Sequence, residues 1–239
     1  MINGGSTMPG QMSNKRYLAI LTVLFLVLAA IVAIKPWYPQ DWMLENVLPV
    51  IFLAYLWGTV NKLTMSKVSY TLIFIFMAFH EIGSHFTYAE VPYDAMFKSI
   101  TGTSFNALVG WERNNFDRVV HFLYGLLLAY PIRELYFRVA DARGFWGYFL
   151  PLEFTMATSM LYELIEWGAA NVVGGDLGMA YLGTQGDIWD AHKDMALASL
   201  GALVAIILTA IINYRVQKDF AREWSESFRI KNHETDGPN

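Results

Sequence analysis

The sequence predicts an all-α membrane protein, a bundle of six transmembrane helices with both termini in the cytoplasm. Of its 239 residues, 55% are hydrophobic and only 16% are charged, whereas soluble domains are usually about a quarter charged. Six apolar segments recur along the chain, and Lys and Arg are concentrated in alternate connections between them. We therefore expect a transmembrane domain at residues 15–213, preceded by a disordered stretch, 1–14, and followed by a cytoplasmic tail, 214–239.

Composition also excludes several classes of site. The chain has no cysteine, which rules out disulfides, thiolate metal sites and cysteine nucleophiles. Its net charge of −4 and the lack of a basic stripe argue against a nucleic-acid partner, because phosphates need clustered Lys and Arg.

The first predicted span covers residues 17–34, eighteen uncharged residues that follow Lys15 and Arg16. A secretory signal peptide has a similar pattern, but this run is long and lacks a clear small-x-small cleavage site. Residues 1–14 are rich in Gly, Ser, Met and Asn, a composition typical of disordered termini. The segment is thus interpreted as a transmembrane helix.

The next two spans are expected at about 46–60 and 68–88. Residues 35–42 hold two prolines and three aromatic residues, which predict a short turn at the level of the lipid headgroups. The second half of the third span is polar, with the sequence FHEIGSH. A long connection, 89–116, mixes Gly, Pro, aromatic and charged residues.

The remaining spans are expected at 117–135, 145–170 and about 195–213. Residues 171–186 between the last two form a glycine-rich loop. The tail carries an apolar residue at every fourth position, which predicts either an interfacial helix on the membrane surface or a solvated segment. The stripe consists of Val216, Phe220, Trp224 and Phe228.

Charge determines the orientation. With six spans, 12 of the 17 Lys and Arg residues fall on the side of the termini, and 13 of the 21 acidic residues fall on the other side. The positive-inside rule then places both termini in the cytoplasm. We expect a protein of the bacterial inner membrane.

This topology gathers titratable side chains at the periplasmic ends of four spans. Four of the five histidines lie on that side, one to three helical turns below the surface. Ionisable residues within transmembrane segments usually have a function. The candidate site residues are His80, Glu81, His85, Asp117, His121, Glu163, Glu166, Asp187, Asp190 and Asp194.

Spacing indicates a metal site. Several of these residues form i,i+3 or i,i+4 pairs on one helical face, and facing helices that carry carboxylates and imidazoles build metal centres. Such ligands suit Zn²⁺, Mn²⁺, Fe²⁺ or Mg²⁺, and a bound cation would offset carboxylates that otherwise repel one another. We expect Glu163 or Glu166 to be the catalytic proton acceptor. The expected metal ligands are His80, Glu81, His85, Asp117, His121, Asp187, Asp190 and Asp194.

Simpler interpretations remain open for individual residues. Asp117 and Asp194 stand where helix N-caps would stand, and capping alone could explain either. Glu163 and Glu166 could be solvated among the headgroups. Glu153, at the cytoplasmic end of its span, is excluded from the site.

Three motifs of the second half resemble the YjdF-type family of bacterial inner-membrane proteins, and the likeness covers nearly the whole chain. The same motifs resemble, more distantly, the VanZ-like membrane domain over about residues 117–201. The family resemblance implies a location and no activity. The motifs are Asp117-x-x-x-His121-Phe122, Glu163-x-x-Glu166-Trp167, and Gly186-Asp187-x-x-Asp190-x-x-x-Asp194 through Gly201.

Three functions are compatible with these observations. The first is a metal-dependent enzyme that acts from the periplasmic side on a lipid or lipid-linked headgroup. The second is a proton- or cation-coupled transporter, and the third is a structural or partner-binding membrane protein. Membrane lipids are the expected partners, and the sequence does not define an oligomeric state.

Overall fold

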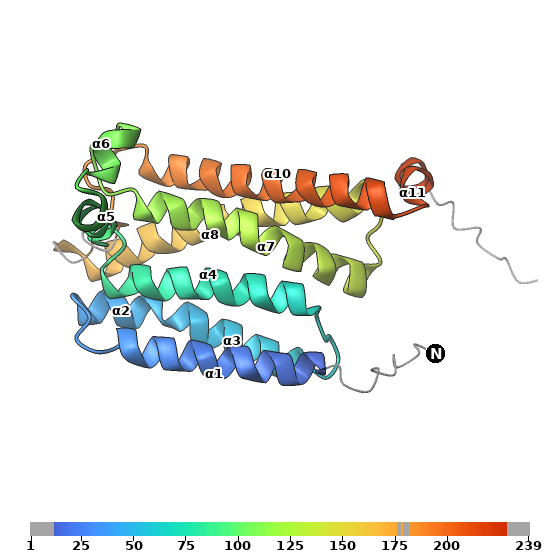
Figure 1. Ribbon diagram of the computed structural model, residues 1–239, viewed down its shortest axis with the longest axis horizontal. Coiled ribbons are helices and arrows are strands. Elements are labelled where there is room, and N and C mark those ends of the chain that lie inside the picture. Colours follow the sequence, from blue (N-terminus) through green and yellow to red (C-terminus); the bar gives the residue numbers. More distant parts are fainter. Residues whose placement is uncertain (1–11, 176–177, 179–181, 229–239) are drawn as a thin grey trace, which may run out of the picture.

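The computed structural model describes residues 12–228, except 176–177 and 179–181. Every regular element among these residues is a helix. Six long helices run along the bundle (Figure 1): α1 (Asn14–Val32), α3 (Val47–Thr59), α4 (Lys67–His85), α7 (Phe116–Ala140), α8 (Trp146–Val173) and α10 (Asp190–Val216). Shorter helices lie at its ends: α2 (Pro39–Glu45), α5 (Tyr93–Thr101), α6 (Phe105–Val109) and α11 (Phe220–Glu226).

Successive long helices alternate in direction. Helices α5 and α6 lie at one end of the bundle, together with the start of α10, whereas α11 and the start of α1 lie at the opposite end (Figure 1). The polar clusters predicted to share one side therefore do fall at the same end of the bundle.

Three segments among the described residues are long and apolar enough to cross a membrane: 14–32, 39–59 and 190–216. This is fewer than the six spans expected from the sequence. The other long helices, α4, α7 and α8, have sufficient length, but charged and polar residues within them lower their mean hydropathy. These are the helices that carry most of the predicted site.

The outer surface of the bundle is apolar. Val23 on α1, Ile51 on α3 and Leu161 on α8 each expose more than half of their surface. Patches of this kind are unfavourable in water and are suited to contact with lipid. The membrane is therefore the environment that this surface favours.

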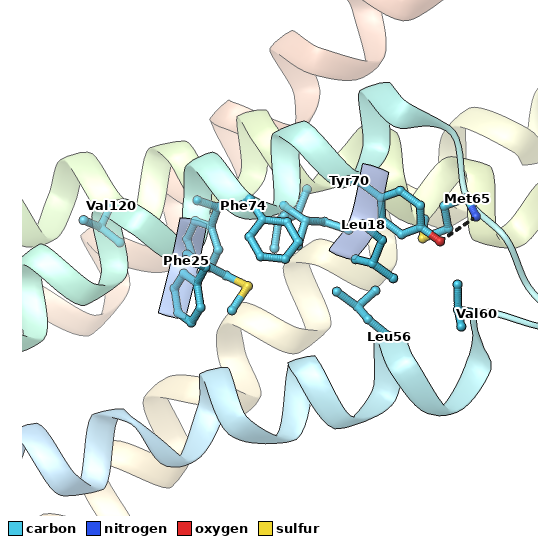
Figure 2. Packing of buried hydrophobic residues seen from close by; sticks show 12 residues of the cluster. Leu18, Phe25, Leu56, Val60, Met65, Tyr70, Phe74 and Val120 are labelled. Atoms are coloured by element: carbon cyan, nitrogen blue, oxygen red, sulfur yellow. Dashed lines mark hydrogen bonds between the residues drawn. The ribbon is translucent and has the colours of Figure 1, made fainter. Parts of the chain in front are cut away.

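The larger hydrophobic core joins α1, α3, α4 and α7 (Figure 2). Phe25 of α1 meets Phe74 of α4 edge-to-face, with 5.9 Å between the ring centroids. The buried Tyr70 hydroxyl accepts a hydrogen bond of 3.1 Å from the backbone N–H of Met65, which satisfies a buried polar group. This core holds α4 against α1, α3 and α7.

Helices α7 and α10 make the most extensive contact in the bundle, and two glycines allow it. A Cβ atom at Gly125 would overlap the carbonyl oxygen of Ala198, and a Cβ atom at Gly201 would overlap that of Phe122. Small residues let helix backbones approach this closely. The crossing aligns the polar beginnings of α7 and α10.

The connection after α1 differs from the prediction. Residues 35–42 were expected to form a turn, but a helix begins at Pro39, a residue suited to the first helical position. Its acidic residues Asp41 and Glu45 are buried, with 2% and 6% of their surface exposed. The long connection 89–116 likewise contains α5 and α6.

The described chain begins differently from the prediction, and its tail contains a helix. Helix α1 begins at Asn14 because the Ser13 side chain caps the N–H of Arg16, so the expected disorder of residues 1–14 can only concern 1–11, which lie outside the described residues. The tail forms α11, whose residue Trp224 packs on Phe145 with 5.7 Å between ring centroids. Residues 229–239 are outside the described part of the tail.

Candidate functional site

Three predicted ligands meet at the centre of the site. Ligand atoms of Asp117, His121 and Asp194 all lie within 4.8 Å of one another. Asp117 and His121 are one turn apart on α7, and His121 Nε2 lies 3.5 Å from Asp117 Oδ1. Asp194 comes from α10 and is 3% exposed. Two carboxylates and one imidazole at this spacing could supply part of the coordination shell of a divalent metal ion.

Glu163 of α8 supplies a third carboxylate. Its Oε1 atom lies 3.6 Å from His121 Nε2, and its side chain is 10% exposed. Among the described residues, Glu163 Oε1 and Asp194 Oδ1 are buried without a hydrogen-bond partner. Such oxygens are costly unless a proton or a cation satisfies them.

The local fold removes the capping interpretation. Asn115 is the N-cap of α7, and Asp117 lies in its first turn. Trp189 is the N-cap of α10, so that Asp194 lies one turn inside the helix. Both carboxylates are therefore directed to the bundle interior by helix geometry and not by capping.

Asp187 and Asp190 lie beside this centre but are engaged by cations. The Asp190 carboxylate accepts from Arg113 at 2.7 Å and from Arg118 at 3.0 Å. The Asp187 carboxylate accepts from Arg118 and from Lys193, at 2.5 Å each. The pKa of Asp187 lies well below its usual range because its carboxylate accepts hydrogen bonds from Lys193, from a backbone N–H and from Arg118. Because these cations occupy the acceptor atoms, the geometry opposes the expected metal-ligand role of both aspartates.

His80 and His85 were also expected to be ligands, and the structure directs them elsewhere. His80 Nε2–H donates to the carbonyl oxygen of Glu45 at 3.2 Å, which leaves Nδ1 to accept from the Tyr88 hydroxyl at 2.5 Å. His85 Nδ1–H donates to the carbonyl oxygen of Val32 at 2.5 Å. These imidazoles tie α4 to its neighbours and lie outside the central group.

Glu81, the remaining ligand expected on α4, is fully buried. Neither of its carboxylate oxygens has a hydrogen-bond partner among the described residues. It is not part of the group formed by Asp117, His121 and Asp194. The structure thus separates the polar residues of α4 from those of α7 and α10.

A hollow of about 380 Å³, part of it open to solvent, lies next to the central group and shares Asp117 with it. Asp41 and Glu45 line it, although the sequence analysis did not select them. Their i,i+4 spacing just after Pro39 was the available signal of a helix with one acidic face. Glu166 lines the same hollow, and the Tyr162 hydroxyl donates to Glu45 at 3.2 Å.

Comparison with known proteins gives one family and one relative. The family described as "Predicted membrane protein (DUF2238)" matches residues 17–215. The chain is 35% identical over 180 residues to "Inner membrane protein YjdF" of Escherichia coli (strain K12), an alignment that covers 75% of this chain and 82% of that relative. No solved structure matches. The expected location in the inner membrane is thereby confirmed, while the more distant VanZ-like resemblance stays a prediction.

Proposed function

Because the chain belongs to the DUF2238 family of predicted membrane proteins, whose description assigns no activity, we propose a function from the geometry of its site. The protein is a metal-dependent membrane enzyme that hydrolyses an ester bond in a lipid or lipid-linked headgroup. The observation that carries this proposal is the convergence of Asp117, His121 and Asp194 within 4.8 Å, with the Glu163 carboxylate beside them.

The proposal gives each side chain a role. Asp117, His121 and Asp194 would hold a divalent metal ion, which would supply Lewis-acid activation of water and of the ester. Glu163 accepts the proton of the attacking water and returns it to the leaving oxygen. A mixed nitrogen and oxygen set favours Zn²⁺, Mn²⁺ or Fe²⁺ over Mg²⁺.

A lipid substrate is suggested by the rim of the site. Val172 at the end of α8 and Ile188 before α10 are 88% and 85% exposed, and Trp167 and Trp189 are more than half exposed. Tryptophan is enriched at membrane interfaces because its ring is amphipathic. An apolar rim at this end lets a headgroup reach the site while its chains stay in the bilayer.

Metal analysis tests the proposal directly. We expect about one divalent metal ion per chain in the detergent-purified protein, measured by plasma mass spectrometry, and less than about a tenth of that in His121→Ala. The imidazole is the only nitrogen ligand of the central group, so its loss removes the strongest interaction with a transition metal.

The matched control is His192→Ala, because this histidine is exposed and lies on α10 close to the same site. Its metal content should equal that of the unaltered protein. Equal metal content in His121→Ala and His192→Ala, or none in the unaltered protein, would refute the metal site.

We propose that all six long helices cross the membrane with both termini in the cytoplasm. The alternation of the helices (Figure 1) and the excess of Lys and Arg at the end of the bundle where the termini lie support this arrangement. In it, the polar side chains of α4, α7 and α8 that are buried within the bundle remain shielded from lipid.

Single cysteines can map this topology, since the chain contains none of its own. We expect a membrane-impermeant maleimide to label Ser99→Cys and Ile188→Cys in spheroplasts with intact membranes. Asn61→Cys, Ala140→Cys and Ser225→Cys should be labelled only after permeabilisation. All five residues are exposed, and the unaltered chain is the blank. Equal labelling of Asn61→Cys and Ser99→Cys in intact membranes would show that α4 does not cross.

A further inference from the structure

The hollow beside the proposed metal centre has features of its own. It lies between α2, the turn that follows α4, and the periplasmic ends of α7 and α8. Four of its lining residues are acidic, and none of the lining residues among the described part of the chain is Lys, Arg or His. The acids are Asp41, Glu45, Asp117 and Glu166.

Asp41 is the lining residue whose carboxylate the described part of the protein leaves unsatisfied. It is 2% exposed, and neither carboxylate oxygen has a hydrogen-bond partner among the described residues. An ionised carboxylate only accepts hydrogen bonds. A buried carboxylate without a donor is unfavourable, so the hollow lacks a group that is both positively charged and a donor.

The shape of the lining selects among cations. Among the described His, Asp and Glu residues, one group of three has its ligand atoms within 4.8 Å of one another. Of the residues that line the hollow, only Asp117 belongs to this group. The other carboxylates of the hollow are therefore too dispersed for one small metal ion. A quaternary ammonium has no N–H donor and favours aromatic cages, but Tyr88 is the only aromatic residue among the described residues of the lining. A primary ammonium offers three donors to separate acceptors.

We propose that this hollow binds the primary ammonium group of an amine, with Asp41, Glu45 and Glu166 as acceptors. The inference deepens the proposed function. It rests on that function only for the identity of the substrate, which would be an amine-bearing headgroup. Because Asp117 is common to both sites, the amine would place a neighbouring ester linkage near the metal centre. The amine can belong to a lipid or to a soluble compound, and the two sources are separated by experiment.

The test measures binding to the full-length protein in detergent by the rise in its unfolding temperature. Ethanolamine should stabilise the protein. Tetramethylammonium, which has no N–H donor, and ethylene glycol, which has no charge, should not. In nanodiscs, greater stabilisation by phosphatidylethanolamine than by phosphatidylglycerol would identify the lipid as the source. Ethanolamine stabilisation without this lipid preference would identify a soluble amine.

Asp41→Asn should weaken ethanolamine binding by about tenfold or more, as expected for the loss of one charge-assisted hydrogen bond. Without ligand this variant should unfold at a higher temperature, because it removes an uncompensated buried charge. Glu166→Gln is the second variant if Asp41→Asn does not fold. Glu112→Gln is the control, since this residue is exposed and is not in the lining.

Two results would overturn the inference: absence of stabilisation by ethanolamine, or equal stabilisation of the unaltered protein, Asp41→Asn and Glu112→Gln. Either would mean that Asp41 is simply protonated in the fold. Metal content distinguishes this failure from that of the proposed function. Amine binding that depends on Asp41 in a protein without metal would uphold the amine site and refute the metal centre.

Discussion

Substitution of Gly201 by leucine is expected to abolish stable folding of the bundle. A Cβ atom at this position would overlap the carbonyl oxygen of Phe122 and approach the backbone of Leu126, so α7 and α10 would have to separate along their largest contact. Overpacking that displaces backbone typically costs about 1–3 kcal/mol and occasionally more, a large part of the stability of a typical protein. The measurement is the yield of monodisperse protein and its unfolding temperature in detergent.

The matched control for this prediction is Gly168→Leu on α8. Gly168 is also helical, but a Cβ atom there would meet nothing within 4 Å. Leucine favours a helix more than glycine does, so the control should be as stable as the unaltered protein or slightly more stable. Comparable stability of Gly201→Leu and Gly168→Leu would contradict the close helix crossing.

The second large effect is expected from Asp190→Ala. Asp190 is 4% exposed and pairs with Arg113 and Arg118, which are 14% and 19% exposed. Its removal leaves two largely buried guanidinium groups with less compensation, and breaking a buried ion pair costs about 3–5 kcal/mol. We expect a marked fall in the unfolding temperature, measured in detergent with and without added divalent metal.

Asp219→Ala provides the comparison, because Asp219 and its partner Arg222 are more than half exposed. Exposed ion pairs contribute at most about 1 kcal/mol, so this variant should unfold near the temperature of the unaltered protein. If Asp190→Ala were equally mild, the arginines would not hold the first turns of α7 and α10 together.

Much of the helical framework follows from local sequence. Uncharged runs such as 17–34 and 195–213 must be helical in a membrane, since helices satisfy their own backbone hydrogen bonds. The short helix at Pro39 was missed because prolines and aromatic residues dominate 35–42. The spacing of Asp41 and Glu45 is present in the sequence, but their burial depends on the helices that pack around them. Composition supports three spans because α4, α7 and α8 carry polar residues in the interior.

The site was predicted as a broad set of residues, and packing divided that set. Periodicity places Asp117 and His121 on one face of α7 but does not state which carboxylate of α10 lies opposite. Asp194 fills that position, while Asp190, one turn earlier, meets Arg113 and Arg118. A shift of one helical turn therefore separates a potential ligand from an ion-pair partner.

Hydropathy, charge and residue spacing were sufficient to predict a helical inner-membrane protein with acids and imidazoles at one end of its bundle. Hydropathy and spacing are properties of neighbouring residues, and they need no knowledge of the fold. Which of these side chains meet depends on helix packing, because the close crossing at Gly125 and Gly201 determines the register between α7 and α10. That register brings Asp117, His121 and Asp194 together and leaves Asp41 facing the adjacent hollow.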